Sequence, residues 1–225
     1  MKIFNQHVKL QSAIAKTRET GYYFIDDAVT LELLQALEVE AQQLKFEEGD
    51  HIAYPINQGA PTEVQQFHER IYLPLDNSKT PTSNQLCHHL SNEIQSCYPE
   101  LKTWLLNEIG FQRYRNTKDW ISPHRDRKSD QFLSLTITIK GSAWINIYRA
   151  LTDPPDYSRL QLKTRFLVER GTAMFLRAPG FGNGQQIIHE VGPPLFGERL
   201  IVNLRMRPTI LKSPEEYSKI YCKVG

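Results

Sequence analysis

The sequence has few of the residues that build disulfide frameworks, and it has no long apolar run. Its three cysteines, Cys87, Cys97 and Cys222, are an odd number without a CxxC pair, which argues against disulfides and a thiolate zinc site. No apolar run approaches the roughly 20 residues of a membrane span, and no secretory signal is recognisable. We therefore expect reduced thiols, a cytoplasmic location and no membrane partner.

An excess of charge of one sign is also missing. The 27 basic and 25 acidic residues leave a net charge of +2, so the overall field would attract nucleic acid only weakly. Hydrophobic residues make up 40% of the chain, which excludes a disordered tail. A length of 225 residues suits one folded domain. We expect a single domain over residues 1–225.

The first 110 residues indicate a helical and loop-rich support. The sequence predicts a strand at 21–27, a helix capped by Thr30, a loop-rich stretch at 47–84, a helix around 86–94 and a helix from Pro99 to Gly110. His68 and Tyr72 fall in the loop-rich stretch, where they either line a pocket or lie in a solvated loop.

From Phe111 onward, short apolar stretches alternate with turn residues. This pattern predicts a β-sandwich or barrel over residues 111–208. A tail at 209–225 follows, with a short helix expected near 213–221. The stretches are QFLSLTITI, AWINIY, TRFLV, TAMFLR, QIIHEV and RLIVNLRMR.

Three residues of this half predict a metal site. His124 and Asp126 are two residues apart, so their side chains point to the same side of an extended chain. His189 lies in another strand-like stretch, 189 − 124 = 65 residues later. Two imidazoles and one carboxylate leave coordination positions open, as in non-haem iron oxygenases, whereas zinc prefers a closed tetrahedron. A surface hydrogen bond between His124 and Asp126 is the alternative.

The strand-like stretch at 199–207 carries apolar residues on one face and arginines on the other. A charged sheet edge would account for this pattern. Alternatively, Arg199 enters the site and grips a dicarboxylate through a two-point guanidinium contact. 2-Oxoglutarate fits the second interpretation, because its keto acid chelates iron while its distal carboxylate needs a fixed cation.

The segment FQRYRNTKDWISPHRD resembles the region around the first two iron ligands of the AlkB family of 2-oxoglutarate dioxygenases. The resemblance covers residues 111–207 and implies an α+β chain with a double-stranded β-helix (jelly-roll) core supported by N-terminal helices. It implies iron ligation by His124, Asp126 and His189, and co-substrate contacts from Tyr114, Arg199, Arg205 and Asn203.

The sequence departs from the family pattern at two positions. Ile201 stands where the family usually has an Asn, and Asn203 comes two residues later on the same strand face. Gln112 stands where an Asn often precedes the co-substrate tyrosine.

The implied activity is that of an Fe(II)- and 2-oxoglutarate-dependent dioxygenase that uses O2 to hydroxylate a C–H bond. The AlkB-like stretch suggests N-alkylated bases of single-stranded DNA or RNA as substrates. The residues Lys118, Arg125, Arg127 and Lys128 would form a basic rim for the phosphate backbone, or simply a solvated cluster. Two alternatives remain. The first is a hydroxylase of a protein side chain or small metabolite, and the second is a non-catalytic binding module with the same fold.

Overall fold

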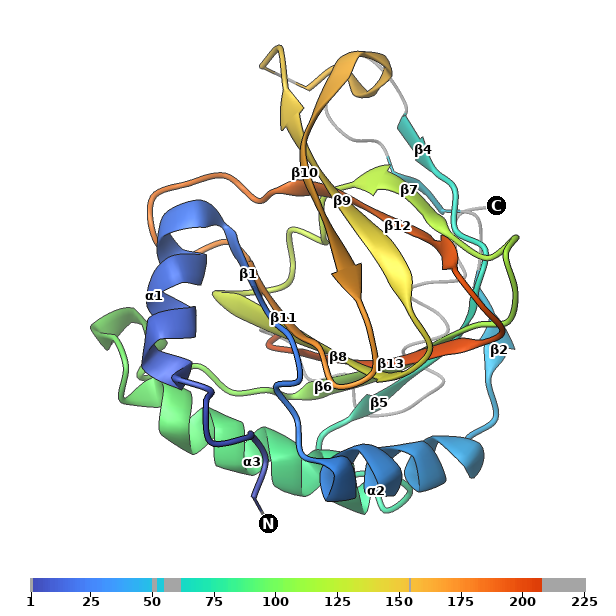
Figure 1. Cartoon of the computed structure of the whole chain (residues 1–225). Coiled ribbons are helices and arrows are strands. Elements are labelled where there is room, and N and C mark those ends of the chain that lie inside the picture. Colours follow the sequence, from blue (N-terminus) through green and yellow to red (C-terminus); the bar gives the residue numbers. More distant parts are fainter. Residues whose placement is uncertain (1, 50–51, 55–61, 154, 208–225) are drawn as a thin grey trace.

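Two antiparallel sheets face each other in a jelly roll (Figure 1). The computed structural model describes residues 2–49, 52–54, 62–153 and 155–207. Within these residues a seven-stranded major sheet has the order β1-β11-β8-β13-β6-β5-β2, and a four-stranded minor sheet has the order β10-β9-β12-β7. The expected double-stranded β-helix is therefore confirmed.

The strands of the major sheet come from both halves of the chain. They are β1 (Tyr22–Ile25), β2 (Glu47–Glu48), β5 (Glu69–Pro74), β6 (Glu108–Tyr114), β8 (Leu133–Lys140), β11 (Ala173–Arg177) and β13 (Arg199–Arg205). The minor sheet contains β7 (Ile121–His124), β9 (Ala143–Ala150), β10 (Leu160–Val168) and β12 (Ile188–Pro194). A separate pair, β3 (Ile52–Tyr54) and β4 (Thr62–Val64), lies within the stretch expected to be loops.

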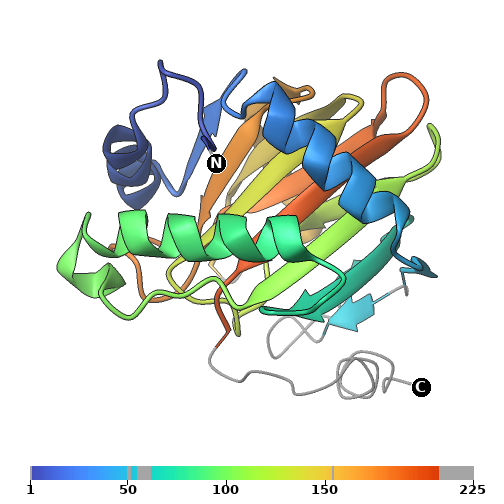
Figure 2. The same cartoon turned by 90° about the horizontal axis from the view of Figure 1, so that it is seen from below.

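Helices cover the outer face of the major sheet, as Figure 2 shows for α2 (Leu31–Gln42) and α3 (Pro81–Gln95). The helix α2 begins where expected, because the Thr30 side chain accepts a hydrogen bond from the backbone N–H of Leu33 at 3.4 Å. The helix α1 (Leu10–Thr20) lies in a leader that the sequence did not identify as helical. None of the described helices is long and apolar enough to cross a membrane.

The helix expected from Pro99 to Gly110 is wrong. Only a 3-10 turn, η1 (Pro99–Leu101), forms there, and β6 already begins at Glu108. Pro99 supplies a helix start, but the following residues gain more from pairing with β5 on one side and β13 on the other. The helix expected at 213–221 lies outside the described residues.

Alternation along the strands separates an apolar layer from a polar interior. On β13, Leu200, Val202 and Leu204 pack into the core beneath the helices. The intervening residues, which include Arg199 and Asn203, line the space between the two sheets. The jelly roll thus places a polar, buried row on the inner face of its major sheet.

Candidate functional site

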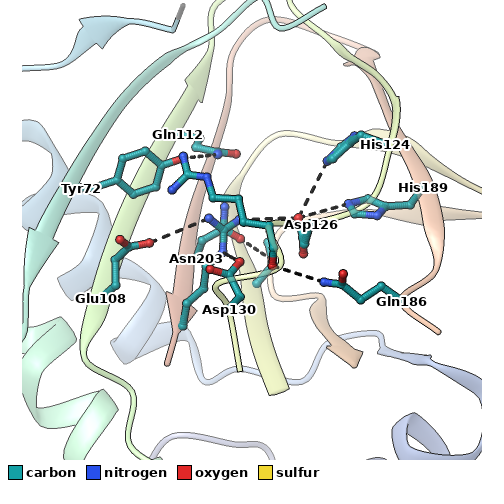
Figure 3. Close-up of polar contacts among 12 residues, drawn as sticks. Tyr72, Glu108, Gln112, His124, Asp126, Asp130, Gln186, His189 and Asn203 are labelled. Carbon is teal, nitrogen blue, oxygen red and sulfur yellow. Dashed lines mark hydrogen bonds and ion pairs between the residues drawn. The ribbon is translucent and has the colours of Figure 1, made fainter. Parts of the chain in front are cut away.

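The three expected metal ligands come together inside the jelly roll. His124 ends β7, Asp126 follows two residues later, and His189 lies on β12 directly opposite His124 in the strand register. Their ligand atoms all lie within 4.8 Å of one another. Figure 3 shows Asp126 beside both imidazoles and joined to each by a dashed line, with its Oδ1 3.9 Å from His124 Nε2 and 4.0 Å from His189 Nε2.

Hydrogen bonding and burial prepare the imidazoles as neutral ligands. The Nδ1–H of His124 donates to the carbonyl of Ser122 at 2.8 Å, which leaves the Nε2 lone pair free for a metal. Burial lowers the pKa of His124, and burial together with the neighbouring His124 lowers the pKa of His189 to about 3. Both rings are therefore unprotonated near neutral pH, as metal ligation requires.

Asp126 is held in its anionic form by its surroundings. Burial alone would raise its pKa, but His189, Arg205 and His124 outweigh burial and lower it below the ordinary value. The donor set of two neutral imidazoles and one carboxylate fits a divalent iron site with open coordination positions.

Arg205 belongs to a buried ion cluster next to the ligands. Its guanidinium lies 3.9 Å from Asp126, 3.6 Å from Asp130 and 4.0 Å from Glu108. Arg207 joins the same cluster at 3.0 Å from Glu108 and 3.4 Å from Asp130. The charge of Arg205 is thus shared among three carboxylates, and its expected contact with a co-substrate stays a prediction.

Arg199 lies at the other end of the polar row and is only 1% exposed. Its guanidinium carbon is 5.2 Å from the centre of the Tyr114 ring, and its Nη2 donates to Thr138 Oγ1 at 3.5 Å. The Nε and Nη1 atoms are buried and have no hydrogen-bond partner among the described residues. Because a buried guanidinium without an anion is costly, this arrangement fits a carboxylate that enters the pocket.

The amide and phenol groups of the pocket wall form a short hydrogen-bonded series. Tyr114 donates its hydroxyl proton to Gln112 at 3.1 Å, and Gln112 Nε2 donates to the hydroxyl of Tyr72 at 3.3 Å. Asn203 accepts a hydrogen bond from Thr136. Asn203 therefore lies on the expected strand face, but its carbonyl oxygen has a partner within the protein.

One pocket is lined by all three candidate metal ligands, by Arg199 and Tyr114, and by Arg205 and Asn203. The metal end and the Arg199 end thus face the same cavity. Of the expected basic rim, Arg125 and Arg127 line this pocket, whereas Lys118 and Lys128 are exposed outside its lining.

The sequence reasoning missed Thr138, although a signal for it was present. On β8, Ser134, Thr136 and Thr138 alternate with buried apolar residues, so a polar inner face was readable from the alternation. His68 and Tyr72 had no such signal, because their place in the interior depends on the pairing of β5 with β6.

The comparisons with known proteins agree with this fold. No family model matches the chain, and no curated protein matches its sequence. Among solved structures, it is similar to a prolyl-4-hydroxylase of Pseudomonas putida, with a TM-score of 0.62 and 12% identity over 89% of this chain and 100% of the other.

Two further structures are similar. The first is a prolyl hydroxylase of Trichoplax adhaerens in complex with a hypoxia inducible factor peptide fragment (TM-score 0.58, 10% identity, 88% of this chain and 89% of the other). The second is an oxidoreductase of the 2OG-Fe(II) oxygenase family from Burkholderia pseudomallei (TM-score 0.55, 13% identity, 89% and 91%). The chain therefore has the fold of prolyl hydroxylases and related 2OG-Fe(II) oxygenases.

Proposed function

We propose that the chain is an Fe(II)- and 2-oxoglutarate-dependent oxygenase that hydroxylates a C–H bond. The observation that carries the proposal is one pocket with a His-Asp-His group at one end and the buried guanidinium of Arg199 at the other, whose Nε and Nη1 have no hydrogen-bond partner among the described residues. A keto acid with a distal carboxylate matches both ends at once. The likeness in fold to 2OG-Fe(II) oxygenases supports this assignment.

Each residue has a defined task in this proposal. His124, Asp126 and His189 would hold Fe(II), and two imidazoles with one carboxylate suit an iron that also takes a keto acid. Arg199 and Thr138 bind the distal carboxylate, and Tyr114 fixes the orientation of the co-substrate. Bound iron supplies the oxidising chemistry, in which 2-oxoglutarate is decarboxylated to succinate while the substrate is hydroxylated.

For the substrate, we place a peptide side chain or a small molecule first. Three similar structures are prolyl hydroxylases or an oxygenase of the same superfamily, and one of them was determined with a peptide. The near-neutral charge of the chain also favours a substrate other than a long polyanion.

An N-alkylated base in single-stranded DNA or RNA is the second candidate. The observation that favours it is the pair Arg125 and Arg127, which flank Asp126 and line the pocket beside the ligands, where a phosphate could be held. The AlkB-like stretch at 111–126 adds to this candidate. Oxidative dealkylation would release an aldehyde from such a base.

Succinate formation tests the proposed reaction. With Fe(II), O2 and 2-oxoglutarate, the protein should form succinate, and the Asp126→Ala variant should form none above the level of free iron. Proline-containing peptides and N-methylated oligonucleotides are then compared for their ability to stimulate succinate formation. Formaldehyde release is also measured with the oligonucleotides. If the parent protein forms no succinate under any of these conditions and binds neither Fe(II) nor 2-oxoglutarate, the proposal is wrong. The non-catalytic module with the same fold would then be the better interpretation.

A further inference from the structure

The residue His68 is fully buried next to the proposed co-substrate end of the pocket, yet neither of its ring nitrogens has a hydrogen-bond partner among the described residues. Its ring stacks on the Tyr114 ring, with centroids 5.1 Å apart and planes inclined by 20°. A buried polar atom without a hydrogen-bond partner destabilises the folded state. Another interaction, absent from the ligand-free protein, would offset this destabilisation.

The backbone around His68 fixes the ring in this position. Phe67 donates its N–H to the carbonyl of Trp120 at 2.9 Å, just before β7, and Glu69 begins β5 opposite Arg113 of β6. The carbonyl of His68 accepts a hydrogen bond from Gly49 at 2.7 Å. The chain thus crosses at His68 from the edge of the minor sheet to the major sheet, and the side chain is directed into the interior between them.

The surroundings of His68 keep its imidazole uncharged. Burial and the neighbouring charges of Arg70, His124, Arg199 and Arg205 lower its pKa to about 3. The group is therefore a neutral imidazole at physiological pH, with one N–H donor and one acceptor nitrogen. Its ring stacks on Tyr114, which lines the pocket and lies 5.2 Å from the Arg199 guanidinium carbon, so His68 adjoins the Arg199 end of the pocket.

We propose that His68 is a further binding residue for the dicarboxylate co-substrate, which supplies the hydrogen-bond partner that the buried imidazole lacks. This inference rests on the proposed function, because it requires 2-oxoglutarate in this pocket. Arg199 provides the charge that neutralises the distal carboxylate. His68 provides an uncharged donor that adds affinity without adding a second positive charge.

The competing interpretation is that His68 only supports the Tyr114 ring by stacking. Two variants separate the interpretations. His68→Phe keeps an aromatic ring against Tyr114 but removes both nitrogens, whereas His68→Gln keeps a donor and an acceptor but removes the aromatic stack. His88→Phe is the matched control, because His88 is an exposed histidine on α3.

The measurement is the dissociation constant of 2-oxoglutarate, determined anaerobically by calorimetry with Mn(II) in place of iron. We expect His68→Phe to bind 2-oxoglutarate about tenfold more weakly, since one hydrogen bond contributes about 1–1.5 kcal/mol. His68→Gln should remain within about threefold of the parent. The affinity for Mn(II) alone should be unchanged in both variants.

Thermal unfolding of the ligand-free protein supplies a second readout. Because His68→Phe removes two buried polar atoms without partners, the ligand-free variant should unfold at a temperature equal to or above that of the parent. Weaker binding combined with undiminished stability is not expected of a residue with a purely structural role.

Three results decide the outcome. If His68→Phe binds 2-oxoglutarate as tightly as the parent, the proposal for His68 is overturned while the proposed function stands. If His68→Gln loses as much affinity as His68→Phe, a hydrogen-bonding group at this position does not restore binding, and the proposal is again overturned. If the parent itself binds no 2-oxoglutarate in the presence of Mn(II), the proposed function and this inference both fail.

Discussion

At the scale of single residues, the interior of the jelly roll separates two kinds of arginine. Arg199 has buried nitrogens without partners among the described residues, whereas Arg205 is surrounded by the carboxylates of Asp126, Asp130 and Glu108. Both lie on the inner face of β13 and both are buried, so neither position nor burial distinguishes them. The two arginines differ in their partners, so substitution of each should have a different effect.

Removal of the Arg199 side chain should weaken the binding of 2-oxoglutarate. Loss of a charge-assisted, two-point contact costs a few kcal/mol, so Arg199→Ala should weaken 2-oxoglutarate binding on the order of a hundredfold. Binding titrations with Mn(II) would measure this change, and Arg149→Ala, at an exposed position on β9, is the control. An unchanged dissociation constant in Arg199→Ala would mean that the distal carboxylate has another anchor.

Removal of Arg205 should affect the fold. Arg205→Met leaves buried carboxylates with one cation fewer, and breaking a buried ion cluster in this way typically costs about 3–5 kcal/mol of unfolding free energy. Arg205→Lys keeps the charge and should lose less. Denaturant unfolding of both variants tests this order, and equal stability of Arg205→Met and the parent would contradict it.

At the scale of elements, the turn between β8 and β9 places Arg199. Gly141 has a positive φ of 75°, and a Cβ on it would lie 2.3 Å from the carbonyl oxygen of Glu198 and 2.9 Å from Arg199 Cα. A residue with a side chain at this position must therefore displace the start of β13. The position of Arg199 therefore depends on a glycine in a neighbouring turn.

Gly141→Ala should lower both stability and co-substrate affinity. Gly197→Ala is the matched control, since Gly197 also has a positive φ of 57° but a Cβ there would meet nothing within 4 Å. Both variants carry backbone strain of about 1–3 kcal/mol, but only Gly141→Ala should also weaken 2-oxoglutarate binding. Equal affinities in the two variants would show that the contact with β13 is unimportant.

The junction of α2 and α3 depends on a buried carboxylate. Glu40 accepts hydrogen bonds from the backbone N–H groups of Thr82 at 2.6 Å and Ser83 at 3.2 Å, which begin α3, and also from the Ser83 hydroxyl. Burial raises the pKa of Glu40, although these hydrogen bonds oppose the shift. An acid with a raised folded-state pKa contributes stability at low pH that is lost as the pH rises through that pKa.

The pH dependence of stability should therefore change when Glu40 is replaced. As the pH rises above about 4.3, the parent should lose stability relative to Glu40→Gln, until Glu40 is fully ionised in the folded state. Denaturant unfolding at several pH values gives the difference between the two proteins, and Gln42→Ala, an exposed position on the same helix, is the control. A difference that grows in the opposite direction would contradict the burial argument.

At the scale of the whole molecule, the alternation of the strands made the core predictable, and it pointed to the three candidate metal ligands that the structure brings together. His124 and Asp126 were readable from their spacing, and His189 from its own strand-like stretch. The other features of the candidate site depend on pairing between segments that are distant in the sequence. The burial of His68 requires β5 to pair with β6, and β6 itself begins where the sequence predicted a helix. The ion cluster of Arg205 likewise joins segments that the sequence keeps far apart.

The most direct test of the account is the visible spectrum of the protein with Fe(II) and 2-oxoglutarate under anaerobic conditions. A keto acid chelated to iron by an open His-Asp-His site gives a weak visible charge-transfer band. The account predicts this band for the parent, its loss in Asp126→Ala, and its appearance only at higher 2-oxoglutarate concentrations in Arg199→Ala. No band in the parent, or a band of full intensity in Asp126→Ala, would contradict the central claim that these residues form one iron and co-substrate site.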